Sequence, residues 1–240
     1  LFRSRNRELD AKNKLIEQER QRSDELLLNI LPAATAAELK THATVKPVRY
    51  ESVTVMFTDF KSFTKIAESV SPEELIAELD GCFRLFDNIV SEFNLEKIKT
   101  IGDSYMCAGG LPVANQTHPV DVVRAAIEMQ CRLHALMQEK QAEGKRLFEM
   151  RIGIHTGPVV AGVVGSHKFA YDIWGDTVNT AARLEQGSEP TKINVSETTY
   201  QLVKDIFPCT YRGRLAAKNK GEIDMYFVEY DCGALMKTKC

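Results

Sequence analysis

The sequence lacks several features that would define a function class directly. No stretch approaches the roughly 18 consecutive apolar residues of a membrane-spanning helix, and no signal peptide is visible. Basic and acidic residues nearly cancel, 31 against 33, which leaves a net charge of −2. Nothing in this balance indicates a nucleic acid or an anionic membrane as a partner. The Gly-Lys-Ser/Thr loop of the common ATPases is absent as well.

Metal-binding cysteine patterns are also missing. The sequence has six cysteines, Cys82, Cys107, Cys131, Cys209, Cys232 and Cys240. They form no Cys-x-x-Cys pair, and none has a histidine partner at metal-ligand spacing. We interpret them as reduced thiols of a cytosolic protein. What the sequence does have is length and apolar content. Its 240 residues, 44% of them hydrophobic, suffice for one sizeable core with room for an extension.

The extension is predicted at the N-terminus. Residues 3–29 are highly charged, contain no glycine or proline, and favour a helix. Their heptad seam is poor because Lys12 and Glu19 fall on core positions, so a solvated helix and a weak parallel coiled coil both stay open. Pro32 predicts a helix boundary near Leu31. The expected division is a signalling helix over 1–31, a linker over 32–47, a globular domain over 48–232 and a tail over 233–240.

The first residues also bear on where the chain comes from. The chain starts at Leu1 rather than at a methionine, and Leu1 and Phe2 are followed by the basic run RSRNR. We expect a fragment of a longer protein, in which this start would fit the cytosolic end of a missing transmembrane helix. The corresponding interpretation is a cytoplasmic domain, downstream of a sensor or of a membrane-anchored receptor.

Two amphipathic helices are predicted in the globular domain. Ser71 is a candidate N-cap with Pro72 at the first helical position, and an apolar stripe continues from there to about Phe93. The second helix, from His118 to Lys140, repeats this design. We expect His118 and His134 at its surface or boundary and assign them no chemistry.

Strands alternate with these helices. The pattern predicts a strand over 149–155, a turn at 156–158 and a second strand over 159–164. A strand over 192–195, a helix over 196–205 and two late strands near Thr210 and Met225 complete the order. Hairpins that alternate with helices after one leading strand indicate an α+β sandwich with a mainly antiparallel sheet.

Two aspartates follow predicted strands. Alternating apolar residues over 53–57 predict a buried strand, and Asp59 follows where this strand leaves the core. Asp103 lies with Gly102 at the tip of a predicted β-hairpin. Either aspartate alone is more typical of a cap or a turn. Together they suit a pair of Mg²⁺ ions, because Mg²⁺ takes oxygen ligands from one or two carboxylates and from substrate phosphates. The turn at 60–62 also offers backbone N–H groups to an anion.

Two further groups of polar residues are ambiguous by themselves. A helix is predicted to begin at 174–177, with Asp176 or Thr177 as its cap, and Asn179 and Arg183 then lie four apart on one face. Such a pair is more often a solvated face. The basic cluster over 212–220 is, on its pattern alone, a turn with solvated lysines.

Four segments in this order resemble the catalytic domain of the class III nucleotidyl cyclases, adenylyl subtype. They are FTDFKSFT at 57–64, EKIKTIGDSYMCAGG at 96–110, MRIGIHTGPVVAGVVG at 150–165 and YDIWGDTVNTAARLE at 171–185. The resemblance covers about residues 50–230. Four separated motifs in the right order are far more specific than any single short pattern. The resemblance implies a ferredoxin-like core with additions, and an upstream helix that couples a sensor to it.

The resemblance implies metal and transition-state roles. Asp59 and Asp103, together with the backbone at Phe60, would bind two Mg²⁺ or Mn²⁺ ions per site. Asn179 would orient the nucleotide ribose. Arg183 would stabilise the charge that builds on the α-phosphate, a task for which its planar, bidentate donors are suited.

The resemblance also implies how the substrate is read. Lys99 and Asp172 would contact the base, because a Lys donor and an Asp acceptor suit the N1 acceptor and 6-amino donor of adenine. The guanylyl members of the family carry Glu and Cys at these positions. Arg151 and Lys218 would bind the triphosphate, with Lys220 as the alternative because the loop LAAKNKGE departs from the commoner Lys-Gly-Lys-Gly form. The predicted substrate site is completed by Phe60, Phe63 and Thr64.

The implied reaction converts ATP to 3′,5′-cyclic AMP and pyrophosphate, by in-line attack of the ribose 3′-oxygen on the α-phosphorus. No residue declares itself as a general base. In the family the aspartates come from one protomer and the base-reading and Asn/Arg residues from the other, so a homodimer with two sites is expected. The alternatives are a guanylyl cyclase and a catalytically silent nucleotide-binding dimerisation domain. The diguanylate cyclase signature Gly-Gly-Asp/Glu-Glu-Phe is absent.

Overall fold

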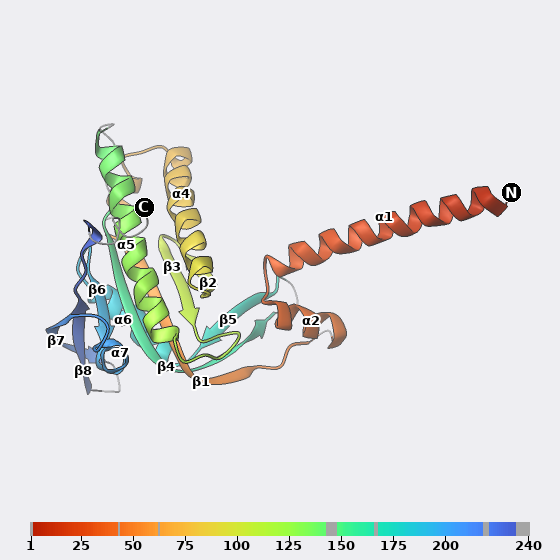
Figure 1. Cartoon of the computed structure of the whole chain (residues 1–240). Coiled ribbons are helices and arrows are strands. Elements are labelled where there is room, and N and C mark those ends of the chain that lie inside the picture. Colours follow the sequence, from red (N-terminus) through yellow and green to blue (C-terminus); the bar gives the residue numbers. More distant parts are fainter. Residues whose placement is uncertain are drawn as a thin grey trace. The chain divides into compact units, whose positions relative to one another are not determined.

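The computed structural model of the protein describes residues 2–42, 44–61, 63–142, 148–165, 168–217 and 221–233. The chain divides into two compact units, residues 1–48 with 162–172, and residues 49–161 with 173–240. Its architecture is mixed α+β, as predicted. Figure 1 shows the elements, which in chain order are α1 (Phe2–Leu28), α2 (Ala33–His42), β1 (Val48–Phe60), α3 (Phe63–Ala67), α4 (Pro72–Glu92), β2 (Glu96–Ile101), β3 (Ser104–Gly109), α5 (His118–Ala142), β4 (Met150–Val164), β5 (Ala170–Trp174), α6 (Asp176–Gln186), β6 (Ile193–Ser196), α7 (Glu197–Val203), β7 (Cys209–Ala217) and β8 (Gly221–Val228).

Helices α1 and α2 belong to the first unit. Leu15, Ile16 and Leu26 of α1 remain exposed, which is the pattern of a solvated helix in this single chain. Helix α1 ends at Leu28, close to the boundary predicted from the proline, and Asp24 near its end pairs with Lys40 of α2 at 2.5 Å. None of the helices in the described part of the chain is both long enough and apolar enough to cross a bilayer. The coiled coil stays a prediction.

The described strands form one eight-stranded sheet with the order β2-β3-β1-β4-β6-β8-β7, and β5 pairs with β4 beside this path. Strands β1 and β2 pair with β3, and β6 and β7 pair with β8, all antiparallel. Strands β4 and β6 are parallel. The sheet is therefore mainly antiparallel, as the sequence predicted.

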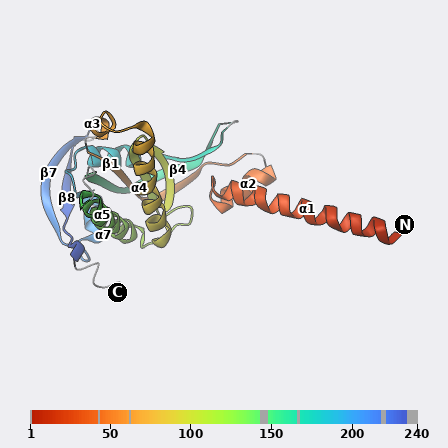
Figure 2. The same ribbon diagram turned by 90° about the horizontal axis from the view of Figure 1, so that it is seen from above.

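The sheet has two differently covered faces, because successive residues of a strand point to opposite sides. Ile152 and Ile154 of β4 lie in the main apolar core with residues of α4, α5 and α7. Figures 1 and 2 show α4 and α5 side by side along this face, which we call the α5 face. Gly153 points to the other side, the α6 face, where an added Cβ would lie 2.0 Å from the backbone nitrogen of Glu185 in α6. Helix α6 therefore packs directly on β4, and only glycine fits at position 153.

Two local predictions are confirmed near the sequence motifs. Ser71 caps α4, with its Oγ accepting a hydrogen bond from the Glu74 N–H at 3.2 Å, and Pro72 is the first residue of the helix. Gly102 occupies the β2–β3 turn with φ of +62°, a conformation that glycine adopts without strain.

The turn predicted at residues 156–158 is wrong. Strand β4 runs without interruption from Met150 to Val164. Gly157 lies against the side chain of Thr177 at the start of α6, and the Thr177 hydroxyl donates to the Pro158 carbonyl at 2.7 Å. This contact holds the segment extended across the sheet. The predicted cap of α6 is also wrong, because Gly175 is the N-cap and no side chain caps the helix.

The interpretation of all cysteines as reduced thiols is corrected for one pair. Cys131 in α5 and Cys232 after β8 form a disulfide with Cα atoms 5.2 Å apart. The two residues are separated by 101 positions, and only the fold of the chain brings them together. In the described part of the chain, Cys82 and Cys107 are buried free thiols and Cys209 is half-buried.

The position expected for His118 is also wrong, because His118 is buried at the start of α5. Its Nδ1 shares a hydrogen bond with the Thr54 hydroxyl at 2.8 Å. Thr54 in turn contacts the Thr156 hydroxyl at 2.8 Å, and Thr156 contacts the Thr199 hydroxyl at 3.0 Å. We call these four residues the hydroxyl network. It links β1, β4, α5 and α7 on the α5 face.

Candidate active site

The two predicted aspartates meet at one end of the central strands. The register that pairs Thr58 with Tyr105 brings the end of β1 beside the β2–β3 turn. The Ser104 hydroxyl there donates to Asp59 Oδ1 at 3.0 Å. Asp103 lies in the turn itself. Burial, and then the nearby charge of Asp59, raise the pKa of Asp103 above its ordinary value, although backbone hydrogen bonds oppose the shift.

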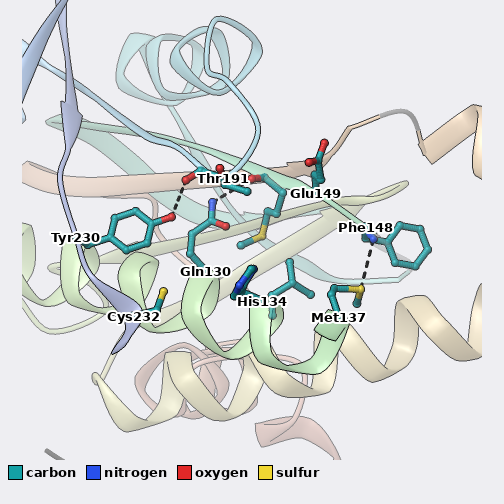
Figure 3. Close-up of a pocket in the computed structure, with 10 residues that line it drawn as sticks. Gln130, His134, Met137, Phe148, Glu149, Thr191, Tyr230 and Cys232 are labelled. Atoms are coloured by element: carbon teal, nitrogen blue, oxygen red, sulfur yellow. Dashed lines mark hydrogen bonds between the residues drawn. The ribbon is translucent and has the colours of Figure 1, made fainter. Parts of the chain in front are cut away.

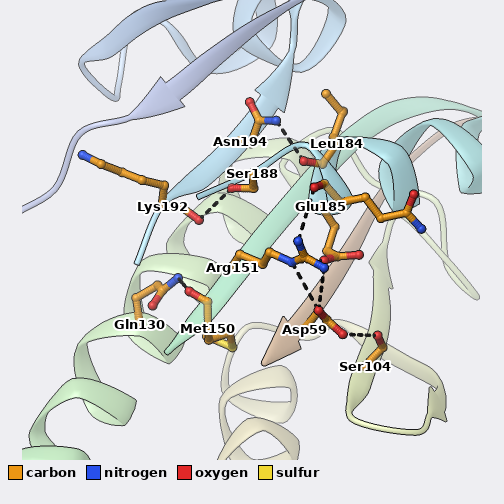
Figure 4. Close-up of polar contacts among 11 residues, drawn as sticks. Asp59, Ser104, Gln130, Met150, Arg151, Leu184, Glu185, Ser188, Lys192 and Asn194 are labelled. Carbon is orange, nitrogen blue, oxygen red and sulfur yellow. Dashed lines mark hydrogen bonds and ion pairs between the residues drawn. The ribbon is translucent and has the colours of Figure 1, made fainter. Parts of the chain in front are cut away.

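Arg151 contacts Asp59 directly. Its Nη2 lies 2.7 Å and its Nε 3.2 Å from Asp59 Oδ2. The Arg151 Nε also lies 2.6 Å from Glu185 Oε1, without the alignment of a hydrogen bond. Figure 4 shows the guanidinium between the two carboxylates. The predicted phosphate-binding arginine is therefore paired with one of the predicted metal ligands.

Glu185 is the residue of this cluster that the sequence analysis missed. Its pKa is raised to about 7, chiefly by burial and then by the charges of Asp59 and Asp103. The charge of Arg151 opposes this shift. The Asn194 side chain donates to the Leu184 carbonyl at 2.9 Å and so fixes the end of α6 beside it. The only sequence signal was an acidic residue in the apolar stripe of an amphipathic helix.

Helix α6 carries the predicted Asn179 and Arg183 on a different side. Its buried residues, Thr177, Thr180, Ala181, Leu184 and Glu185, form one continuous stripe. Asn179 is exposed and Arg183 is half-exposed, and their spacing of four puts them together opposite Ala181. Within the described residues, neither side chain makes a hydrogen bond or ion pair. The structure thus separates these two residues from the aspartates by the thickness of the helix.

Lys99 reaches the α6 face through an irregularity of β2. Lys97 pairs with Cys107 and Lys99 pairs with Met106, with a register shift between them. Cys107 lies in the α5-face core, and Lys97 forms an ion pair at 2.7 Å with Asp87 of α4 on that side. Regular alternation would point both lysines the same way, so this bulge is what separates them. Asp172, the other predicted base-reading residue, is half-buried on β5 in the first unit.

For the remaining predicted substrate-binding residues, the structure shows side chains used in core packing or does not describe them. The Phe60 ring packs against Phe86 and Phe148 in the core, and Phe63 lies near Phe148, so their rings serve packing. The N–H of Lys61 donates to the Glu149 carbonyl at 2.8 Å, which removes one donor of the turn predicted to receive an anion. The positions of Ser62, Lys218 and Lys220 and the side chain of Thr64 lie outside the described residues.

Asp59 and Asp103 could supply part of the oxygen coordination shell of a hard cation, but not all of it. No cluster of three or more His, Cys, Asp or Glu side chains arranged for a metal occurs in the ranges described above. Asp59 and Asp103 supply oxygen ligands only, and Asp59 already holds a positive group, the Arg151 guanidinium, in this structure. Two carboxylates with the remaining ligands from phosphate are a typical Mg²⁺ arrangement.

A pocket lies apart from these residues. It has a volume of about 350 Å³ between α5, the start of β4 and the segment after β8. Figure 3 shows Gln130, His134, Met137 and Tyr230 among its lining residues. The Tyr230 hydroxyl donates to the Thr191 carbonyl at 2.6 Å, so part of its polar lining is already paired. Neither Asp59 nor Asp103 contributes to it.

Comparison with known proteins identifies the fold as that of a nucleotide cyclase catalytic domain. Residues 45–230 match the family described as the adenylate and guanylate cyclase catalytic domain. An adenylate cyclase of Mycobacterium bovis is 38% identical over 215 residues, which cover 89% of this chain and 48% of that protein. The soluble guanylate cyclase subunit beta-2 of Rattus norvegicus is 35% identical over 211 residues, covering 88% of this chain and 30% of that protein. The chain belongs to the class III nucleotidyl cyclases.

Solved structures agree with this assignment. The adenylyl cyclase CyaB from P. aeruginosa has a TM-score of 0.74 at 30% identity, and the match covers 78% of this chain and 97% of that one. The guanylate cyclase domain of RhGC from Catenaria anguillulae, solved with GTP, has a TM-score of 0.70 at 32% identity and covers 76% and 98%. The chain spans less than half the length of the curated relatives named above.

Proposed function

We propose that this domain is an adenylyl cyclase that converts ATP to 3′,5′-cyclic AMP and pyrophosphate. The observation that carries the proposal is the arrangement of Asp59 and Asp103 at one strand end, with Arg151 beside them. Carboxylates for hard cations and a guanidinium for phosphate are what phosphoryl chemistry requires. Membership of the family makes a cyclisation, rather than a hydrolysis, the expected outcome.

The predicted metal-binding, phosphate-binding and transition-state residues each have a proposed task. Asp59 and Asp103 would hold the cations with the backbone carbonyl of Phe60, and Arg151 would bind the triphosphate together with Lys218 or Lys220. Two divalent cations, when bound, would lower the pKa of the ribose 3′-hydroxyl and neutralise the leaving pyrophosphate. Asn179 orients the ribose, and Arg183 stabilises the charge that develops on the α-phosphate. No side chain is assigned as a general base, so the proton passes to solvent or to substrate.

A homodimer with two composite sites is part of the proposal. Asn179 and Arg183 lie on the outer side of α6, whereas Glu185 on the inner side contacts Arg151. One helix cannot present both sides to the same nucleotide, so Asn179 and Arg183 are available to a site on a second chain. A symmetric dimer would then contain two equivalent sites.

The choice of adenine rests on Lys99 and Asp172. Overall identity does not distinguish the substrate, because the adenylate cyclase relative is 38% identical and the guanylate cyclase relative 35%. Lys97 is paired with Asp87 on the α5 face, which leaves Lys99 as the lysine of β2 on the α6 face. Its ammonium donor and the Asp172 acceptor match the edge of adenine and oppose that of guanine.

The rest of the chain is proposed to regulate this domain. The boundaries inferred from the sequence, a helix over 1–31, a linker over 32–47, the catalytic domain over 48–232 and a tail over 233–240, are kept. We propose that the helix transmits a signal from an upstream sensor, in a protein whose catalytic domain is cytoplasmic.

A product assay tests the proposal. The purified chain is incubated with ATP or with GTP, each with Mg²⁺ or Mn²⁺, and the products are identified by chromatography and mass spectrometry. Cyclic AMP from ATP, in excess over cyclic GTP from GTP, is the expected result. Preferential cyclic GTP would assign the chain to the guanylyl cyclases, and nucleotide binding without either product would make it a silent dimerisation domain.

A further inference from the structure

We propose that Glu185 is a positioning residue that shares the Arg151 guanidinium with Asp59, so that Arg151 serves as an internal counter-ion at Asp59 until a divalent cation replaces it. The inference deepens the proposed function and rests on its metal site. It assigns a task to Glu185, which lies neither among the proposed metal ligands nor among the proposed base-reading residues.

The geometry is that of one cation between two anions. The Arg151 guanidinium lies 2.7 Å from Asp59 Oδ2 and 2.6 Å from Glu185 Oε1. Its Nη1 also donates to the Gln186 carbonyl at 3.3 Å. Figure 4 shows that these partners approach the guanidinium from β1 on one side and from α6 on the other. Arg151 can therefore lose its contact with Asp59 and still be held by α6.

In the part of the chain that the structure describes, Arg151 is the charged partner of the Glu185 side chain. The residue is 5% exposed, and its Oε1 forms an ion pair with Arg151 but has no hydrogen-bond partner among the described residues. A buried carboxylate is costly unless it is paired. The close packing of Gly153 on the backbone of Glu185 fixes where this carboxylate lies, two residues along β4 from Arg151.

The exchange follows from charge. A divalent cation at Asp59 repels a guanidinium within a few ångströms, so Arg151 must leave Asp59 for the cation to bind. Glu185 provides the opposite charge that keeps the arginine in the site, near where the triphosphate would lie. Without Glu185, Arg151 keeps its ion pair with Asp59 as the remaining one among the described residues, and this pairing competes more strongly with the metal.

The test measures Mn²⁺ binding to the nucleotide-free chain, by the loss of the electron paramagnetic resonance signal of the free ion. Arg151→Ala removes the counter-ion and should tighten Mn²⁺ binding about tenfold, although the same variant loses cyclase activity. Glu185→Gln keeps the shape and should weaken binding by about three- to tenfold. Glu189→Gln, a nearby exposed acid that pairs with Arg212, is the matched control and should leave binding unchanged.

The double variant separates a positioning role from a general electrostatic one. If Glu185 acts through Arg151, Glu185→Gln in the Arg151→Ala background should change Mn²⁺ affinity by less than about twofold. Equal effects of Glu185→Gln in both backgrounds, or weaker Mn²⁺ binding by Arg151→Ala, would overturn the inference. Thermal unfolding of each variant identifies any loss of fold, and Glu185→Asp provides a variant with the charge restored, which should bind more tightly than Glu185→Gln. Failure of the unaltered chain to bind Mn²⁺ would overturn both this inference and the metal site of the proposed function, whereas an unchanged Glu185→Gln overturns only the inference.

Discussion

The two faces of the sheet bury polar groups in opposite ways. On the α5 face, the hydroxyl network joins neutral groups: His118, Thr54, Thr156 and Thr199 contact one another at 2.8 to 3.0 Å. On the α6 face, two carboxylates share one guanidinium, and a third carboxylate, Asp103, lies close to Asp59. A satisfied neutral network fixes structure, whereas a cluster with more negative than positive charge is ready to receive a cation. The contrast predicts that damage to the α6 face should cost activity, and damage to the α5 face should cost stability.

The largest effect is expected for Asp103→Ala. Loss of one of two metal carboxylates should reduce cyclase activity by at least about a hundredfold, because the charge on the phosphates is no longer neutralised. The fold should persist, since Asp103 lies in a turn. Initial rates with ATP and Mg²⁺, together with a thermal melt, measure both quantities. Asp80→Ala, which breaks an exposed pair with Arg84 on α4, is the control. Substantial Mg²⁺-dependent turnover by Asp103→Ala would contradict the assignment of Asp59 and Asp103 as the two metal-binding carboxylates.

The base preference tests whether the α6 face also reads the substrate. Lys99→Glu combined with Asp172→Cys should shift preference from ATP toward GTP by roughly one to two orders of magnitude, because each mismatched buried group costs about 1–3 kcal/mol. The ratio of kcat/KM for the two nucleotides is the measurement. Lys97→Glu, only two residues away but on the α5 face, is the matched control and should leave this ratio unchanged. An unaltered ratio in the double variant would mean that other residues read the purine.

A mixing experiment asks whether the outer side of α6 completes the site of a second chain. Asp59→Ala and Arg183→Ala should each be inactive alone. After subunit exchange of equal amounts, about half the dimers pair the two variants and have one intact site, so about a quarter of the original activity should return. A mixture of Asp59→Ala with Asp103→Ala should stay inactive, because both lesions affect the same half of each site. If the first mixture stays inactive although a label shows exchange, the site lies within one chain.

The smallest effect is expected from the α5 face. Burial lowers the pKa of His118 below 6.5, while the charge of Asp121 opposes this shift. Below pH 6.5 the unfolded chain therefore binds a proton at His118 more readily than the folded chain does. The contribution of the neutral His118 to the free energy of unfolding is fully present above pH 6.5 and is lost as the pH falls below it. Comparing denaturant unfolding at pH 7.5 and pH 5.5 should show a smaller difference for His118→Gln than for the unaltered chain. His134→Gln, exposed on the same helix, should behave as the unaltered chain. Equal pH dependence in all three would contradict the buried, neutral histidine.

Elements that depend only on neighbouring residues could be predicted from the sequence. Ser71 and Pro72 start α4, and Gly102 allows the β2–β3 turn that carries Asp103, because capping and turn chemistry act over a few positions. Alternating apolar residues likewise located the strand that carries Asp59 near its end. Four ordered motifs were enough to identify the family, which the comparisons then confirmed.

Features that depend on strand register and on contacts between distant residues could not be predicted from the sequence and follow from the packing of the folded chain. Local chemistry favoured a turn at Gly157 and Pro158, but packing against Thr177 of α6 holds β4 extended there. One bulge in β2 sends Lys97 and Lys99 to opposite faces, and a separation of 101 residues hid the pairing of Cys131 with Cys232. The pairing of Glu185 with Arg151 could not be predicted either, because the two residues lie far apart in the sequence. Helical periodicity predicts which side of α6 is buried, whereas the residue that meets this side is set by how β4 and α6 pack at Gly153.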